Sequence, residues 1–215
     1  MLFFATVGKT RGTAGEQKAL LIADRLGSPT IKDCPFLIFN TKPYSEVFGG
    51  KMKKIAVIMG SDSDLAVVEK GIKVLEEFGA PFEVHVFSAH RTPAEAREFT
   101  VNAENNGFGV IIAAAGKAAH LAGSIAANTT LPVIGIPVKS SVLDGLDALL
   151  STVQMPAGIP VATVAIDGAA NAALLALQIL AVEDKALGMK LKDSRKAASE
   201  KVLMKNKEIC ERFSK

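Results

Sequence analysis

Aromatic side chains are scarce in this 215-residue chain, which has no tryptophan and one tyrosine. Proteins that bind single-stranded nucleic acids stack the bases on aromatic side chains along a basic groove. The formal net charge is only +3, and part of it comes from a basic C-terminal stretch. We therefore expect no nucleic-acid partner.

Cysteine is equally rare. Cys34 and Cys210 lie far apart, with no C-x-x-C spacing and no histidine pair nearby. Disulfide frameworks and structural zinc sites need ligands grouped more closely than this. We predict neither a disulfide framework nor a metal site, and we expect a protein of the reducing cytoplasm.

The chain also lacks a long apolar run free of polar residues. Its longest apolar stretch, residues 110–138, is interrupted by Lys117, His120, Asn128 and Pro132. The apolar start, residues 1–5, is too short for a signal peptide and carries no charged segment. We expect no membrane span and no secretion signal.

Hydrophobic residues make up 49% of the chain, which is enough for one core. From residue 54 onward they form short apolar runs that alternate with amphipathic stretches. Apolar strands joined by helices form a mostly parallel sheet that is covered on both faces. We predict an α/β fold, a three-layer αβα sandwich that is flavodoxin-like with an extra C-terminal helix; a Rossmann-like sheet is the alternative. The predicted strands are residues 55–59, 82–87, 110–115, 133–136 and 161–166, and apolar residues spaced three or four apart predict a helix over residues 65–78.

Three parts are expected along the chain. Glycines and prolines break the pattern in residues 1–52, where only residues 17–26 look helical. This part is either a poorly structured appendage or an over-extended reading frame whose natural start is Met52. Residues 53–188 form the α/β domain, ending in a buried alanine-rich helix over residues 169–183. Residues 189–215 form an exposed helix that packs on a neighbouring subunit of a homo-oligomer.

Two polar loops follow the first two predicted strands, at the sheet edge where such folds bind ligands. Gly60 allows a tight turn after which Ser61, Ser63 and Asp64 open a helix. Backbone N–H groups there can receive an anion, and the Asp64 carboxylate can hold sugar hydroxyls. An ordinary helix cap is the alternative.

The second loop, S-A-H-R-T-P over residues 88–93, places His90 beside Arg91. Arginine binds phosphate through a two-pronged contact and imidazole titrates near neutral pH, so the pair suits proton transfer on a phosphorylated substrate. A structural histidine is the alternative. A third loop of small residues, 115–123, carries His120 and either approaches a ligand or packs a helix on the sheet. A fourth, residues 154–160, is either a lid or a plain connector.

Six motifs in order resemble the class I PurE family, the N5-carboxyaminoimidazole ribonucleotide mutases of bacterial purine biosynthesis. The likeness covers about residues 53–207. The motifs are V-I-M-G-S-D-S-D (57–64), S-A-H-R-T-P (88–93), A-A-H-L (118–121), L-P-V-I-G-I-P-V (131–138), L-L-S-T-V-Q-M-P (149–156) and I-P-V-A-T-V-A-I (159–166).

The resemblance implies that a carboxylate moves from an exocyclic nitrogen to a ring carbon of an imidazole ribonucleotide, with no cofactor or metal and with CO2 enclosed as an intermediate. His90 would carry the protons, Arg91 and the serines would hold the phosphate, and Asp64 the ribose. The implied substrate-binding residues are Ser61, Ser63, Asp64, Ser88, Arg91 and His120. The fourth loop would help close the site, and members are usually octamers with sites between subunits.

This sequence departs from the family at three positions. Ala114 and Lys117 stand where glycine is usual, and Ala122 stands where proline is usual. Arg91 favours the mutase class, because the related carboxylases that use free CO2 typically carry lysine there. Direct carboxylation by CO2 is nevertheless one alternative activity, and a flavodoxin-like module that binds a phosphorylated ligand without catalysis is another.

Overall fold

The structure, a computed structural model, describes residues 52–141 and 143–214. The helix expected over residues 17–26 therefore lies outside the described residues. In chain order the elements are β1 (Lys54–Met59), the short 3-10 helix η2 (Asp62–Asp64), α3 (Leu65–Phe78), β2 (Phe82–Val86), α4 (Pro93–Asn102), β3 (Phe108–Gly116), α5 (Leu121–Ala126), β4 (Val133–Val138), η3 (Leu143–Gly145), α6 (Leu146–Val153), β5 (Ala162–Thr163), α7 (Ala169–Leu180) and α8 (Lys185–Phe213).

The five strands form one sheet in the order β2-β1-β3-β4-β5, and every neighbouring pair is parallel. This order is that of flavodoxin-like sheets, so the predicted fold class is confirmed and the Rossmann-like alternative is wrong. The chain leaves β1 toward β2 on one side and returns to β3 on the other. The strand order thus reverses between β1 and β3, which is where such sheets bind ligands.

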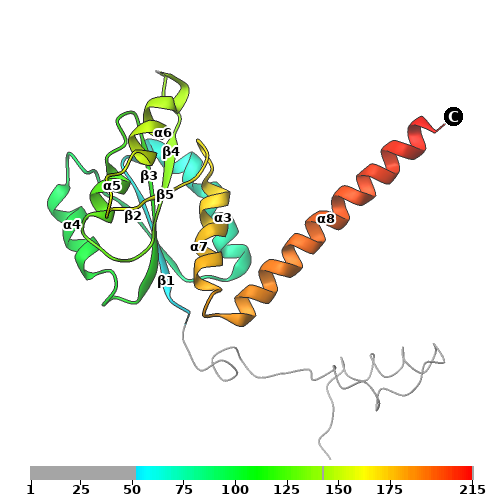
Figure 1. Ribbon diagram of the computed structural model, residues 1–215, viewed down its shortest axis with the longest axis horizontal. Helices are drawn as coiled ribbons and strands as arrows, with labels where there is room; N and C mark the ends of the chain where they lie inside the picture. The colour runs from blue at the N-terminus through cyan, green and yellow to red at the C-terminus, as the bar shows by residue number, and fades with distance from the viewer. Residues whose placement is uncertain (1–51, 142, 215) are drawn as a thin grey trace, which may run out of the picture. The chain divides into compact units, whose positions relative to one another are not determined.

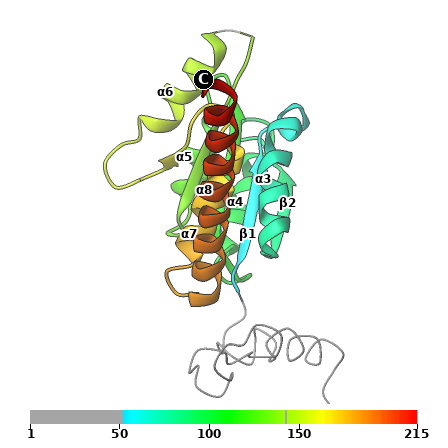
Figure 2. The ribbon, with the colours of Figure 1, turned by 90° about the vertical axis from the view of Figure 1, so that its right-hand side faces the viewer.

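Helices cover both faces of the sheet, as Figures 1 and 2 show. Ile55 and Val57 of β1 point to the face covered by α3 and α7, whereas Ala56 and Ile58 belong to the core on the opposite face, beneath α5. Because successive side chains of a strand point to opposite faces, an unbroken apolar run serves both cores.

Small residues bring α3 and α7 close together. A Cβ atom added to Gly71 of α3 would lie 2.7 Å from the carbonyl oxygen of Ala169, the first residue of α7. Ala172, Ala173 and Ala176 of α7 are fully buried in the same layer. The predicted buried alanine-rich helix is confirmed, and it ends at Leu180, three residues earlier than expected.

The last strand is much shorter than the predicted residues 161–166. Only Ala162 and Thr163 pair with β4, opposite Ile134 and Gly135. Pro160 has no N–H group to donate to a ladder, and Asp167 adopts a positive φ of 56° that turns the chain away. These two residues only bound the predicted segment. Beyond Thr163 the chain keeps single hydrogen bonds to β4, from the Val164 N–H to the Gly135 carbonyl oxygen (3.1 Å) and from the Asp167 N–H to that of Pro137 (2.9 Å), without continuing the ladder.

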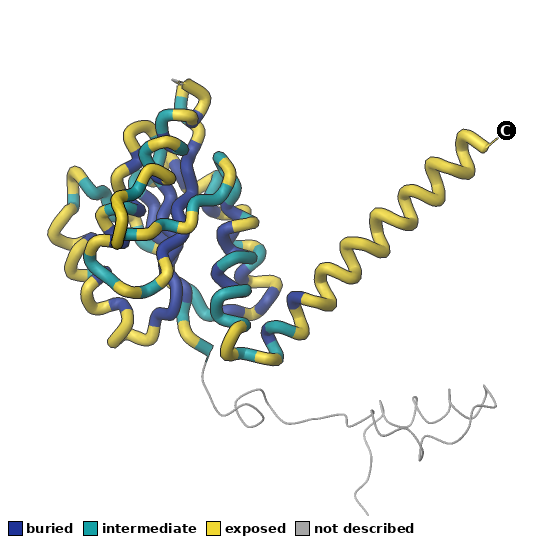
Figure 3. Tube along the Cα trace, in the orientation of Figure 1, coloured by how far each residue is buried: buried dark blue, intermediate teal, exposed yellow. Residues whose placement is uncertain are grey.

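The C-terminal helix α8 begins at Lys185, ahead of the charged stretch that predicted it. The Asp184 carboxylate caps its first turn by accepting a hydrogen bond of 2.9 Å from the Leu187 N–H, and Leu187 and Leu191 are buried. From Lys192 to Ser214 every residue is exposed, as Figure 3 shows. No helix in the described part of the chain is both long and apolar enough to span a membrane.

Candidate active site

The loops that follow β1, β2, β3 and β4 surround a cavity of about 780 Å³ at the carboxyl ends of the strands, which we call the strand-end cavity. All the residues that the sequence predicted for a site line it: Ser61, Ser63, Asp64, Ser88, His90, Arg91 and His120. The parallel sheet accounts for this, because each strand delivers its following loop to the same edge. Lys117 and Lys139 line the cavity as well.

Serine hydroxyls organise the loop after β1. Ser61 Oγ accepts a hydrogen bond of 3.3 Å from the Ser63 N–H and one of 2.9 Å from Ser63 Oγ, and it donates to Asp62 Oδ1 at 3.0 Å. Ser61 therefore caps η2, so the helix-cap interpretation is confirmed. The same serines line the strand-end cavity, so a ligand that accepts hydrogen bonds from their hydroxyl groups replaces the present hydroxyl partners.

Asp64 is the acidic residue of the cavity lining, and only 7% of its surface is exposed. Burial raises the pKa of its carboxyl group above the usual value. Hydrogen bonds from the Ser61 backbone and the Ser63 side chain act in the opposite direction and limit the rise. The buried carboxylate has few partners of its own, which leaves it free to accept hydrogen bonds from a bound ligand.

The second loop is a tight turn built around Ser88. Ser88 Oγ accepts hydrogen bonds from the His90 N–H at 3.3 Å and from the Arg91 N–H at 3.2 Å. Thr92 Oγ1 accepts one of 2.8 Å from the Ser88 N–H. Pro93 then begins α4 with a φ that suits the first turn of a helix. These contacts hold the backbone beneath both functional side chains.

Arg91 joins the first two loops. Its Nη2 donates a hydrogen bond of 3.1 Å to the carbonyl oxygen of Gly60, the residue that follows β1. A guanidinium group has five N–H donors, so this bond orients the side chain and leaves donors for an anion in the cavity. A planar group held in this way is suited to a two-pronged contact with phosphate.

The two histidines of the cavity contact each other directly. His90 Nε2 lies 2.9 Å from His120 Nδ1, and the rings meet edge to face with centroids 5.1 Å apart. One nitrogen must donate and the other accept, so the protonation of the two rings is linked.

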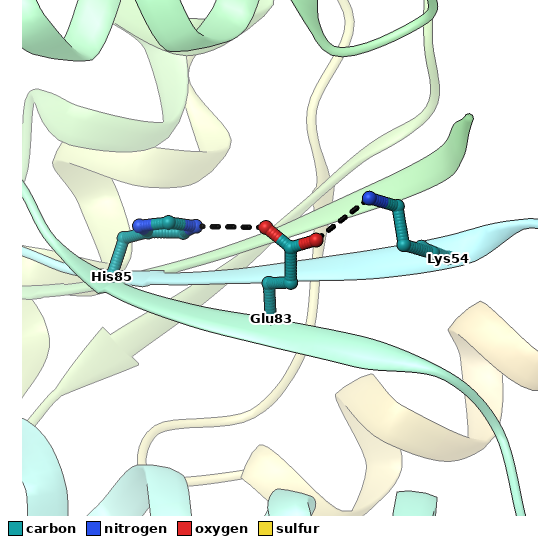
Figure 4. A network of polar contacts seen from close by, with 3 residues as sticks. All are labelled: Lys54, Glu83 and His85. Carbon is teal, nitrogen blue, oxygen red and sulfur yellow. Dashed lines mark hydrogen bonds and ion pairs between the residues drawn. The ribbon is translucent and has the colours of Figure 1, made fainter. Parts of the chain in front are cut away.

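The remaining histidine has a different place. His85 lies on β2, where its Nε2 is 3.5 Å from Glu83 Oε2, while Lys54 Nζ is 2.6 Å from the other Glu83 oxygen (Figure 4). The hydrogen bond from Lys54 lowers the pKa of the Glu83 carboxyl group. The His85 ring also stacks on Phe87, with centroids 5.2 Å apart. This network joins β1 to β2 and does not line the strand-end cavity.

Comparison with known proteins assigns the chain to a family. Residues 54–201 match the family model described as AIR carboxylase. The chain belongs to the AIR carboxylase family. It is 56% identical over 157 residues to the N5-carboxyaminoimidazole ribonucleotide mutase of Pyrococcus horikoshii, a match that spans 73% of this chain and 89% of that protein.

Two further members of the AIR carboxylase family bear on the activity and the fold. The phosphoribosylaminoimidazole carboxylase of Saccharomyces cerevisiae is 50% identical over 155 residues, which are 72% of this chain and 27% of that longer protein. The crystal structure of PurE from Treponema denticola superposes with a TM-score of 0.65 at 27% identity, covering 75% of this chain and 99% of that one. The family that the motifs resembled is therefore confirmed.

The departures from the usual AIR carboxylase family pattern fall in two environments. Ala114 and Ala122 are buried in the two cores and do not line the strand-end cavity. Lys117 does line it, with a positive φ of 56°. A side chain in this left-handed conformation costs roughly 1–2 kcal/mol, whereas glycine adopts it freely. The usual glycine is thus explained by the backbone, and this chain keeps a lysine at that cost.

One predicted loop does not reach the site, and the segment after β4, Lys139 to Ser141, lines the cavity without having been predicted. In a single chain the strand-end cavity is not lined by residues 154–160; Gly158, Ile159 and Pro160 line a separate cavity of about 940 Å³ that includes the residues before β4. Lys139 follows β4 and lines the strand-end cavity, where its Nζ is 3.0 Å from Asp144 Oδ1. Its place directly after an apolar strand was the signal that could have found it.

Proposed function

We propose that this protein is an N5-carboxyaminoimidazole ribonucleotide mutase of purine biosynthesis. The observation that carries the proposal is the composition of the strand-end cavity. Arg91 and the serines that line it are suited to binding a phosphate, and the contacting His90 and His120 are suited to proton transfer. The 56% identity to a protein with that activity agrees with it. The substrate is an imidazole ribonucleotide that carries a carboxylate on its exocyclic nitrogen.

The reaction requires one proton to be given and one to be taken. The bond between the exocyclic nitrogen and the carboxylate breaks, CO2 leaves, and His90 donates a proton to that nitrogen. The ring carbon C4 then attacks the enclosed CO2, and His90 removes the proton from C4. The proton count is balanced over the cycle. Enclosure keeps CO2 beside the ring, where its effective concentration far exceeds that in solution.

His120 holds His90 in a defined state during this cycle. When the ring nitrogen of one histidine donates, that of the other must accept, so a change at His90 can be matched by His120 across the 2.9 Å contact. An imidazole ring can act both as a general acid and as a general base.

The nucleotide is held by the other two loops. Arg91 and the hydroxyl groups of Ser61, Ser63 and Ser88 bind the phosphate, Ser61 and Ser63 by exchanging their present hydroxyl partners for it. Ser88 Oγ already accepts two backbone N–H bonds, but its own hydrogen remains available to donate. Asp64 accepts hydrogen bonds from the ribose hydroxyls, which replace the water that its burial removes.

Direct carboxylation of the aminoimidazole ribonucleotide by CO2 is a second candidate activity. The Saccharomyces cerevisiae relative, named a carboxylase, is 50% identical, so overall similarity does not separate the two activities. The same cavity serves both, because each ends with C4 attacking CO2. They differ in whether the carboxylate arrives on the nucleotide or from solution.

The deciding experiment gives the purified protein freshly made N5-carboxyaminoimidazole ribonucleotide and follows the C4-carboxylated isomer by ultraviolet absorbance. We expect the isomer to form faster than the substrate loses CO2 in buffer. His90→Asn lowers kcat by about 10³-fold or more, because proton transfer by a positioned side chain contributes that order of rate. The variant keeps nucleotide binding within about threefold, since His90 is assigned no share of the phosphate contacts.

His85→Asn is the matched control, because His85 lies on β2 outside the strand-end cavity. We expect it to retain activity. Product that forms only from the aminoimidazole ribonucleotide and CO2 would establish the carboxylase instead. Binding of the nucleotide with no turnover of either substrate would leave a non-catalytic binding module as the function.

We also propose that the protein assembles as a homo-oligomer, an octamer by its family resemblance, with α8 packing on a neighbouring subunit. Two helices support this with exposed apolar side chains at helical spacing: Leu146, Leu150 and Val153 on α6, and Val202, Ile209 and Phe213 on α8. Apolar rows of this kind usually mark contact surfaces. The fourth loop, residues 154–160, does not line the strand-end cavity of its own chain. A role as a lid therefore requires it to cover the cavity of a neighbouring subunit.

A further inference from the structure

Lys117 lines the strand-end cavity although its backbone conformation is unfavourable for a residue with a side chain. It has a φ of 56°, in the region that favours glycine, and it belongs to the loop between β3 and α5 that lines the strand-end cavity. Side chains kept in sparsely populated backbone conformations concentrate at sites where they act on a ligand. A lysine here adds a charge to the cavity that a glycine could not supply.

The three basic residues of the cavity lining differ in their partners. Arg91 donates to the Gly60 carbonyl oxygen at 3.1 Å, and Lys139 forms an ion pair of 3.0 Å with Asp144. The Lys117 ammonium group makes no hydrogen bond or ion pair with any residue in the ranges 52–141 and 143–214. Its ammonium group is therefore open to a ligand without displacing any partner in the described chain, as are the remaining N–H groups of Arg91.

The position of Lys117 indicates which part of the ligand it faces. Its loop leads directly into α5, where His120 stands immediately before the helix with its Nδ1 2.9 Å from His90. The proton-carrying histidines must lie beside the imidazole ring. The phosphate is assigned to Arg91 and to serines of the loops after β1 and β2, and Lys117 shares its loop with His120, so we place it at the ring end of the cavity.

We propose that Lys117 is a specificity-determining residue whose ammonium group binds the carboxylate of the imidazole nucleotide. This inference rests on the proposed function, in which substrate and product each carry one carboxylate and the decarboxylated intermediate carries none. An ammonium–carboxylate contact is a charge-assisted hydrogen bond, which is stronger than one between neutral groups. Lys117 thus favours carboxylated nucleotides over the bare aminoimidazole nucleotide.

Calorimetric titration of the full chain with two ligands tests the assignment. One is the stable C4-carboxylated ribonucleotide and the other is the aminoimidazole ribonucleotide, which has the same phosphate and ribose but no carboxylate. We expect Lys117→Met to weaken the carboxylated ligand about 10-fold or more and the bare ligand by no more than about twofold. Lys117→Arg keeps the charge and stays within about threefold for both.

Two further variants serve as controls. One separates the effect of the Lys117 charge from that of its backbone conformation, and the other tests whether loss of any positive charge on the protein weakens binding. Lys117→Gly removes both the charge and the strained conformation, so it should bind like Lys117→Met while its unfolding temperature rises. Lys192→Met removes an exposed charge from α8, outside the cavity, and should bind both ligands like the unchanged protein.

Equal weakening of the two ligands in Lys117→Met would overturn the inference, because Lys117 would then contact the phosphate. Unchanged binding of both ligands would overturn it as well, because the Lys117 side chain would then contact solvent and neither ligand. Unchanged protein that binds both nucleotides but converts neither N5-carboxyaminoimidazole ribonucleotide nor the bare nucleotide with CO2 would refute the proposed enzyme alone. The two failures are thus distinguishable.

Discussion

At the scale of single residues, the Asp64 carboxylate lowers the stability of the fold but is the group that we assign to the ribose. Burial raises the pKa of its carboxyl group, so the folded protein holds that proton more tightly than the unfolded chain does. The pKa of the carboxyl group in the unfolded chain is near 3.9, and its pKa in the folded protein is higher. As the pH rises from the first through the second, the carboxylate ionises in a buried position and the free energy of unfolding falls. We expect Asp64→Asn to raise the free energy of unfolding at pH 7 and to have little advantage at pH 4.

Chemical denaturation at the two pH values measures this difference, and titration with nucleotide shows the accompanying loss of affinity. Glu77→Gln is the control, since Glu77 is an exposed acidic residue near the other end of α3, away from Asp64. An Asp64→Asn variant that is less stable than the unchanged protein at pH 7 would show that hydrogen bonds to the carboxylate outweigh the cost of its burial.

At the scale of elements, the contact between α3 and α7 depends on one glycine. A Cβ atom on Gly71 would lie 2.7 Å from the Ala169 carbonyl oxygen, which is backbone and cannot rotate away. We expect Gly71→Ala to lower the free energy of unfolding by about 1–3 kcal/mol through overpacking, even though alanine is the better helix former. Denaturant unfolding followed by circular dichroism measures the change.

Glu69→Ala is the matched control on the same helix, because Glu69 is exposed and meets neither α7 nor the sheet core. It should change stability by less than about 0.5 kcal/mol. If Gly71→Ala proves as stable as this control, α7 can move away from α3 and the close approach is not required by the fold.

At the scale of the whole molecule, α8 carries an apolar row that its own domain does not cover. Leu187 and Leu191 begin the row and are buried, and Val202, Ile209 and Phe213 continue it on the exposed part of the helix. A row that is used for packing at one end is suited to packing along its length. We expect Ile209→Asp to reduce the assembled mass by at least half in light scattering, with monomer stability little changed.

Met204→Asp is the control for this prediction. Ile209 and Met204 are exposed to 59% and 60%, so the two substitutions place the same charge on equally accessible apolar sites of different helix faces. The assembly should tolerate Met204→Asp. Identical masses for both variants and the unchanged protein would contradict the assignment of this row to a subunit contact.

Much of the fold could be predicted because it follows from local patterns. Apolar runs separated by amphipathic stretches determined the strands β1 to β4 and helices α3 and α7 within a few residues, since side-chain periodicity is set by backbone geometry. The pattern predicted too long a β5, because apolar residues do not show over what length an edge strand stays in register with its partner strand. It placed the start of α8 late, because the capping bond of Asp184 lies outside the charged stretch.

The sequence by itself determined the α/β fold class and the group of polar residues at one sheet edge, because parallel strands with helical crossovers must deliver their loops to the same side. Only the tertiary structure decided that His90 meets His120 across 30 positions of sequence at 2.9 Å, and that Arg91 bonds to Gly60. It alone showed that Lys117 lines the cavity with left-handed backbone. Local patterns determine which residues reach an edge, whereas strand order and packing determine which of them touch.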